Sequence, residues 1–183
     1  GSIGRQTLEV VEELGLRVAA LTAHSSVERM EEQVRKFHPA LAVMTDENAA
    51  AELKVRLADT ETRVLGGFDA LCEAAVYPDA DTVVTAVVGM IGLQPTMAAI
   101  KKGKRIAFAN KETLVCAGEM VMDAAEKYGA EIIPVDSEHS AIFQCLMGCG
   151  DRREVKRLVL TCSGGPFFGM TKDALGEVTK ADA

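Results

Sequence analysis

The chain has no tryptophan, and aromatic residues make up only 4% of its 183 residues. It also lacks a Cys-x-x-Cys pair, although five cysteines stand at positions 72, 116, 145, 149 and 162. Paired spacing is typical of disulfide frameworks and structural zinc sites, so neither is indicated. One helical turn explains the spacing of Cys145 and Cys149 as well as a metal does. We therefore expect reduced thiols, as in a cytosolic protein.

An excess of basic charge and a long apolar run are also missing. Twenty Lys and Arg residues against 27 Asp and Glu residues give a net charge of −7. A nucleic-acid backbone attracts the opposite sign, so we expect no nucleic-acid partner. The longest apolar stretch, residues 83–93, is far shorter than the roughly 20 residues that cross a bilayer. Because no charged-then-apolar signal peptide opens the chain either, we expect no membrane partner.

What the chain does have is a repeated alternation of strand and helix patterns, with 48% hydrophobic residues to form a core. An amphipathic helix opens the chain, with Leu8, Val11 and Leu14 on one face. Further helices are expected at residues 27–37, 49–57, 67–73, 95–101, 113–128 and 140–147. Strands are expected at residues 17–21, 40–44, 63–65, 82–88, 105–109, 131–135 and 157–160. This order predicts an α/β fold with a doubly wound parallel sheet.

Three polar strings directly follow the last three predicted strands. They are Asn110-Lys111-Glu112, Asp136-Ser137-Glu138-His139, and Thr-Cys-Ser-Gly-Gly-Pro-Phe at residues 161–167. In open α/β sheets, ligands bind at the carboxyl ends of the strands. The sequence therefore predicts that an amide, an ammonium group, two carboxylates and a glycine-rich turn meet in one crevice, as in a reaction site.

The second string, residues 136–139, has two interpretations. In an extended segment Asp136 and Glu138 would project to the same side, and a divalent cation between them would relieve their repulsion. Alternatively, Asp136 or Ser137 caps a helix, and Glu138 complements the helix dipole in the first turn. The pattern alone leaves both open.

The other two strings are equally ambiguous. Asn110 can hold a carboxamide or ribose hydroxyl and Lys111 a phosphate or carbonyl, or the string can be an ordinary helix start with Glu112 in its first turn. The backbone N–H groups of residues 161–167 and the Ser163 hydroxyl could bind a phosphate, or the segment could be a plain β-turn.

Taken together, these strings resemble the 1-deoxy-D-xylulose-5-phosphate reductoisomerase family, and the resemblance covers essentially the whole chain. The most specific parts are Ala109-Asn110-Lys111-Glu112-Thr113-Leu114-Val115, Pro134-Val135-Asp136-Ser137-Glu138-His139-Ser140-Ala141-Ile142-Phe143-Gln144 and Cys162-Ser163-Gly164-Gly165-Pro166-Phe167. It implies a Rossmann-like NADPH-binding domain at residues 1–135, lacking its first strand. Residues 136–183 would begin an α/β catalytic and metal-binding domain.

The resemblance also implies a reaction. The family isomerises 1-deoxy-D-xylulose 5-phosphate and then reduces the resulting aldehyde with NADPH. The product is 2-C-methyl-D-erythritol 4-phosphate, in non-mevalonate isoprenoid synthesis. A divalent metal (Mn, Mg or Co) chelates adjacent oxygens of this phosphorylated sugar. A homodimer in the full-length protein, and a cytoplasmic location (or a plastid in a plant or related eukaryote), are implied as well.

Residue roles follow from the same resemblance. Lys111 and Glu138 would be catalytic, and Asp136 and Glu138 would bind the metal. The substrate-binding residues would be Lys111, Ser137, Glu138 and Ser163. The cofactor-binding residues would be Gly1, Ser2, Ile3, Ser25, Ser26, Asn110 and Glu112, with residues 1–4 as the second half of a glycine-rich nucleotide loop.

Two departures limit this transfer. Residues 23–26 read Ala-His-Ser-Ser where the family has a Gly followed by a basic residue and Asn, so the preference for NADPH over NADH rests on serine hydroxyls. His24 is expected in a solvent-facing loop. The family's His-Pro-Asn-Trp loop and third acidic metal ligand would follow Ala183, so we expect the 183 residues to be an inactive part of a larger protein. A generic NAD(P)-dependent dehydrogenase and a non-catalytic nucleotide-binding module are the alternatives.

Overall fold

The computed structural model describes residues 1–161 and 165–183, which form two compact units. Unit 1 comprises residues Gly1–Pro134 and unit 2 comprises residues Val135–Ala183. The division falls one residue before the domain boundary expected from the sequence. The functions expected of the two domains remain predictions.

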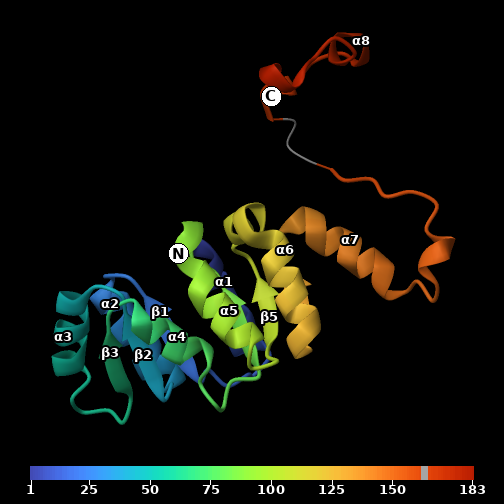
Figure 1. Cartoon of the computed structure of the whole chain (residues 1–183). Helices are drawn as coiled ribbons and strands as arrows, with labels where there is room; N and C mark the ends of the chain where they lie inside the picture. The colour runs from blue at the N-terminus through green and yellow to red at the C-terminus, as the bar shows by residue number, and fades with distance from the viewer. Residues whose placement is uncertain (162–164) are drawn as a thin grey trace. The chain divides into compact units, whose positions relative to one another are not determined.

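Unit 1 contains two parallel sheets of three strands each (Figure 1). The first has the order β1-β2-β3, with β1 at Ala20–Ala23, β2 at Leu41–Met44 and β3 at Arg63–Gly66. The second has the order β4-β5-β6, with β4 at Thr82–Thr85, β5 at Arg105–Phe108 and β6 at Ile132–Pro134. Helices connect successive strands, so the predicted α/β, Rossmann-like class is confirmed.

The helices of unit 1 are α1 (Ser2–Glu13), α2 (Val27–Phe37), α3 (Glu47–Arg56), α4 (Asp69–Ala75), the 3₁₀ helix η1 (Gly89–Gly92), α5 (Leu93–Ile100) and α6 (Lys111–Tyr128). Unit 2 contains α7 (Ser137–Met147), α8 (Lys172–Leu175) and the 3₁₀ helices η2 (Arg152–Glu154), η3 (Gly165–Phe167) and η4 (Lys180–Asp182). The helix at Val27–Phe37 has the predicted bounds. By contrast β1 begins at Ala20 and not at residue 17, because its pairing with β2 starts where Ala20 meets Leu41.

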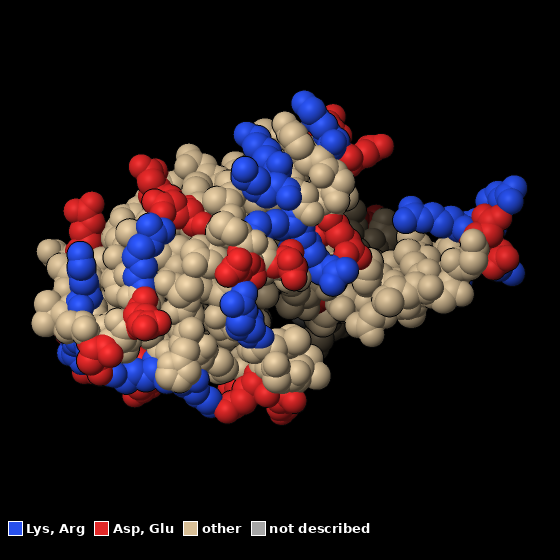
Figure 2. All heavy atoms as spheres, turned by 90° about the horizontal axis from the view of Figure 1, so that it is seen from below, with Lys and Arg blue, Asp and Glu red and all other residues tan. Residues whose placement is uncertain are grey.

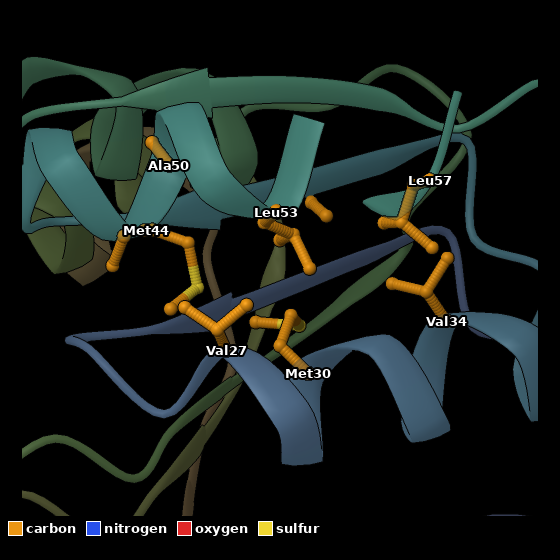
Figure 3. Close-up of a cluster of buried hydrophobic side chains, with 9 residues drawn as sticks. Val27, Met30, Val34, Met44, Ala50, Leu53 and Leu57 are labelled. Carbon is orange, nitrogen blue, oxygen red and sulfur yellow. The ribbon is translucent and has the colours of Figure 1, made fainter. Parts of the chain in front are cut away.

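Helices cover the first sheet on both faces. Every residue of β2 is buried, and alternate residues face opposite sides. Ala42 and Met44 pack with α2 and α3, whereas Leu41 and Val43 pack with α4. In Figure 3 the apolar side chains of α2 point toward Met44, Leu53 and Leu57. This explains why β2 is apolar throughout, as strands covered on both faces are.

One face of the second sheet packs against α5 and α6. Ile106 and Phe108 of β5 are buried with a group of helix residues, namely Ala99, Ile100, Val121 and Ala125. Val84, in the neighbouring strand β4, retains 38% of its exposure. The carboxyl end of β5, where Phe108 is buried, therefore lies on a packed layer, and the polar residues that follow β5 are built on this layer.

Unit 2 differs because none of its described residues is buried. The predicted strand at residues 157–160 is wrong: these residues have no regular structure, and Leu158, Val159 and Leu160 are 62–65% exposed. A strand is stable only when its backbone groups pair with a neighbour. Among the described residues, no strand pairs with this segment, so its apolar composition alone does not produce one.

Charge and hydropathy on the structure agree with the composition. Figure 2 shows acidic and basic side chains interspersed over most of the viewed face. Within the described residues, no helix combines the length and the apolar character that crossing a membrane requires.

Candidate functional site

The first candidate region lies after β5, where the chain turns into α6. Asn110 is the N-cap residue, and Lys111 and Glu112 form the first turn of the helix with exposed side chains. The helix-start interpretation of this string is therefore confirmed. The negative charge of Glu112 in the first turn is favourable beside the positive end of the helix dipole. The exposed Lys111 side chain is accessible at the edge of the sheet.

The Asn110 side chain is completely buried, which the sequence did not indicate. Its amide nitrogen Nδ2 donates one hydrogen bond of 3.0 Å to the Gly89 carbonyl oxygen and another of 3.0 Å to Oε2 of Glu112. Its oxygen Oδ1 accepts a hydrogen bond from the hydroxyl of Thr113, which is also fully buried. The carboxamide thus joins η1 to the start of α6.

Helix α6 is interrupted just after this region. Ala117 has φ −140° and ψ 26°, which are not helical values. The long packed part of the helix, with buried Val121 and Ala125, follows the interruption. Lys111 and Glu112 therefore lie on a short segment with its own attachment to the rest of unit 1.

The other predicted cofactor residues of unit 1 lie at two helix starts. Gly1 is the N-cap of α1 and Ser2 and Ile3 are already helical, so the expectation of a loop at residues 1–4 is wrong for residues 2–4. The amphipathic helix expected at the start of the chain therefore already includes Ser2. Ser25 and Ser26 are exposed between β1 and α2, and the Ser26 side chain makes no capping bond.

His24, just before the two serines, is exposed as expected. Its Nδ1 lies 2.7 Å from the Thr45 hydroxyl oxygen. Because β1 ends at Ala23 and β2 at Met44, this contact joins the two chain segments that leave the carboxyl ends of these strands. It fixes the path of the chain into Ser25 and Ser26.

The second candidate region is the start of α7 in unit 2. Asp136 is the N-cap, and its carboxylate accepts from the backbone N–H of His139 at 3.3 Å. Nδ1 of His139 also lies 2.6 Å from Oδ2 of Asp136, and the Ser137 hydroxyl donates to Oε2 of Glu138 at 2.9 Å. The capping interpretation is therefore confirmed. The extended-backbone premise of the metal interpretation is wrong, because Ser137 and Glu138 are already helical.

A metal role for Asp136 and Glu138 remains compatible with this geometry. A capping aspartate still presents carboxylate oxygens, and such oxygens suit Mg²⁺ and Mn²⁺. Among the described residues, however, no group of three or more His, Cys, Asp and Glu side chains could hold a metal ion. The two carboxylates thus fit such an ion as part of its ligand set.

The third region, residues 161–167, is described only in part. Ser163, the predicted phosphate ligand, lies outside the described residues. Gly165 begins η3 with a φ of 50°, a left-handed value that favours glycine. The strand expected to lead into this turn is absent, as described above.

The structure therefore brings Asn110, Lys111 and Glu112 together in unit 1, and Asp136, Ser137 and Glu138 together in unit 2. Their meeting in one crevice remains a prediction. The sequence reasoning missed Thr113, Gly89 and Gly92, which surround the Asn110 carboxamide. The one local signal was a hydroxyl three residues after Asn110, the spacing at which N-terminal helix residues exchange hydrogen bonds.

Comparison with known proteins connects these two regions to one family. The family model for 1-deoxy-D-xylulose 5-phosphate reductoisomerase matches residues 1–118, and the model for the C-terminal domain of the same enzyme matches residues 132–183. The chain belongs to the 1-deoxy-D-xylulose 5-phosphate reductoisomerase family. The resemblance noted from the three polar strings is thereby confirmed.

Individual reductoisomerases are similar along the entire chain. The protein named 1-deoxy-D-xylulose 5-phosphate reductoisomerase in Lachnoclostridium phytofermentans is 52% identical over 184 residues, covering 100% of this chain and 47% of the relative. Its counterpart in Cyanothece is 46% identical over 187 residues, covering 100% of this chain and 48% of the relative. The chain spans about half the length of the curated relatives it matches.

Solved reductoisomerase structures show the same fold. The enzyme from Zymomonas mobilis in complex with NADPH superimposes with a TM-score of 0.86 at 41% identity, covering 98% of this chain and 47% of that one. A reductoisomerase in complex with magnesium gives a TM-score of 0.82 at 37% identity, covering 100% of this chain and 49% of that one.

Proposed function

We propose that these residues belong to an enzyme that isomerises 1-deoxy-D-xylulose 5-phosphate and reduces the product with NADPH, giving 2-C-methyl-D-erythritol 4-phosphate. The observation that carries the proposal is the Asp136–His139 string at the start of α7, in a chain 52% identical throughout to a reductoisomerase. Relatives bound to NADPH and to magnesium support the same cofactors here.

Unit 1 would hold the nucleotide. Gly1, Ser2 and Ile3 begin α1, Ser25 and Ser26 precede α2, and Asn110 and Glu112 begin α6. Backbone N–H groups at helix starts favour anions, so these positions suit the phosphates of a dinucleotide. The exposed serine hydroxyls can donate to the 2′-phosphate of NADPH in the absence of a basic residue in that segment.

Unit 2 would hold the reacting sugar. Asp136 and Glu138 would bind a divalent cation, and Ser137 and Glu138 would contact the substrate, with Ser163 on its phosphate. The family resemblance assigns a substrate contact to Lys111 of unit 1 as well. A bound Mg²⁺ or Mn²⁺ supplies stabilisation of developing alkoxide charge. The protein's contribution is orientation: Ser137 donates to Glu138, and His139 holds Asp136. A homodimer in the cytoplasm is part of the same proposal.

Turnover tests the proposal. The natural gene product that contains these residues at full length should oxidise NADPH when given 1-deoxy-D-xylulose 5-phosphate with Mn²⁺ or Mg²⁺, as followed by the loss of NADPH absorbance. The 183 residues alone should not, because they span only 47% of the relative from Lachnoclostridium phytofermentans, and misplacing reacting atoms by ~1 Å already costs about 100-fold in rate. Nucleotide binding without turnover by the full-length product would favour a non-catalytic module instead.

A substitution tests the metal ligand separately from the helix cap. Asp136→Asn keeps a good N-cap but removes a carboxylate, so the metal concentration for half-maximal turnover should rise about 10-fold or more. Asp46→Asn makes the same change at the N-cap of α3 and is the matched control, expected to leave metal dependence unchanged. Equal metal dependence of Asp136→Asn and the unaltered enzyme would remove the assignment.

A further inference from the structure

The buried carboxamide of Asn110 has a role beyond direct contact with a nucleotide. We infer that Asn110 is a positioning residue, whose side chain fixes the Glu112 carboxylate and the Gly89 carbonyl at the sheet edge and so determines nucleotide affinity through them. The inference deepens the proposed function and rests on it. Its starting point is that the Asn110 side chain has no exposed surface.

The hydrogen bonds require a carboxamide at this position. Nδ2 supplies two donated bonds, to Gly89 and Glu112, and Oδ1 accepts one from Thr113. An aspartate could accept the hydrogen bond from Thr113. Its other carboxylate oxygen, however, would face the Gly89 carbonyl oxygen and Oε2 of Glu112, both of which are acceptors. A leucine would leave three polar groups without this partner, and the loss would be costly at Thr113, whose side chain is fully buried.

The interruption of α6 increases the importance of the Asn110 hydrogen bonds for the positions of Lys111 and Glu112. Because Ala117 is not helical, the rigid packing of Val121 and Ala125 is not carried unbroken to the first turn. Between Lys111 and Cys116 the only buried side chain is that of Thr113. Leu114 adds a partly buried contact with the core of the second sheet. The orientation of this short segment therefore depends on that contact and on the hydrogen bond between Thr113 and Asn110.

The neighbouring loop is shaped around the same carboxamide. A Cβ atom at Gly92 would overlap Oδ1 of Asn110 and would lie 2.7 Å from Cγ2 of Val87. Gly92 is itself buried, so the overlap could not be relieved toward solvent. The absence of a side chain at Gly92 lets η1 approach Asn110 closely enough for the Gly89 carbonyl to accept its hydrogen bond.

A swap of hydrogen-bond partners tests the inference in the full-length gene product. Asn110→Asp should raise the dissociation constant for NADPH by about 10- to 100-fold, because it loses the donor to Glu112 and Gly89. Adding Glu112→Gln restores one donor between the two side chains, now in the opposite direction. The two substitutions should therefore be coupled: the loss of NADPH affinity in the double variant should be at least about 5-fold smaller than the product of the losses in Asn110→Asp and Glu112→Gln alone.

Thr113 provides a second, milder pair in case Asn110→Asp does not fold. Thr113→Ser keeps the hydroxyl that donates to Oδ1 and should retain NADPH affinity, whereas Thr113→Val should weaken it about 5-fold or more. The KM for NADPH should change more than kcat. If the variants only lost structure in general, a thermal melt would show equally lowered melting temperatures for Thr113→Ser and Thr113→Val.

The outcomes separate the inference from the proposed function. No coupling between Asn110→Asp and Glu112→Gln in NADPH affinity, with Thr113→Val equal to Thr113→Ser, would overturn the inference. If the unaltered product does not bind NADPH, the proposed function fails. In that case urea unfolding measures the coupling free energy between the substitutions at residues 110 and 112. A measurable coupling still supports the positioning contact, and its absence overturns it.

Discussion

The two units of the chain use the same kinds of residues but differ in how much they bury. Unit 1 buries three groups of apolar side chains, between its sheets and helices. Unit 2 contains the eleven-residue helix α7 and the apolar residues Leu158, Val159 and Leu160, yet none of its described residues is buried. Apolar composition therefore does not distinguish them. The difference lies in whether parallel strands provide surfaces on which helices can pack.

Local signals, by contrast, work equally in both units. Asp46 caps α3 in unit 1 by accepting from Ala49 at 2.7 Å, and Asp136 caps α7 in unit 2. A cap involves only four neighbouring residues, so it forms wherever the helix forms. Capping fixes where a helix begins, and burial decides how much the helix contributes to stability.

The largest expected effect is on the core. Leu53 of α3 is fully buried against residues of α2 and β2. The substitution Leu53→Ala should therefore lower the free energy of unfolding by about 2–5 kcal/mol. Leu158→Ala makes the same change at a side chain that is 62% exposed, and should cost less than about 0.5 kcal/mol. Urea unfolding followed by circular dichroism measures both. A large cost at Leu158 would contradict the contrast between the units.

A smaller effect is expected at the helix caps. Asp46→Ala should lower the free energy of unfolding of unit 1 by about 1 kcal/mol, because the N–H of Ala49 loses its acceptor. Asp136→Ala should have less effect on the same transition, since α7 contributes no buried residue. Asp46→Asn, which retains a capping oxygen, is the control. Equal losses from the two alanine variants would show that α7 unfolds together with the core.

The smallest expected effect comes from the surface charges of α2 and α3. Hydrogen bonds from Arg35 hold the pKa values of Asp59 and Glu31 below their ordinary range, and Arg56 adds to the effect on Glu31. Lowered carboxylate pKa values stabilise the fold above the unfolded-state values of about 4, and this contribution disappears as pH falls through the folded-state values.

Arg35→Gln should therefore destabilise unit 1 slightly near neutral pH, and the difference from the unaltered chain should shrink as the pH falls below about 4. Arg153→Gln in unit 2 is the matched case. Arg153 lowers the pKa of Asp151 through a contact only two residues away, which connects no separate elements. Its effect on the unfolding midpoint should be smaller at every pH. A larger effect from Arg153→Gln would reverse the comparison.

Periodicity predicted most of unit 1 because helices α2 to α6 each pack apolar residues against a sheet, whereas α1 buries none. The helix at Val27–Phe37 was predicted to the residue, since Val27, Met30 and Val34 repeat at helical spacing and all three are buried. The strand at residues 157–160 was predicted by the same reasoning and is absent. Its β-forming residues need a partner strand, and a partner cannot be read from a single segment.

The candidate site was predictable in position more than in detail. Polar residues after β5 and β6 were correctly located at the ends of strands, because parallel strands place them there. The burial of Asn110 was not predictable, since one of its partners is a backbone carbonyl 21 residues earlier. Any residue type could supply that carbonyl, so the sequence carries no signal for it.

The width of the two sheets has a consequence for how this protein behaves at high concentration. Each sheet is three strands wide, so two strands in each lie at an edge. Edge strands offer free N–H and C=O groups to a strand of a neighbouring molecule and can seed aggregation. Pro134 lacks an N–H and so blunts the edge at β6, whereas β1, β3 and β4 contain no proline. At these three edges the strand length of only four residues is the main restraint on self-association.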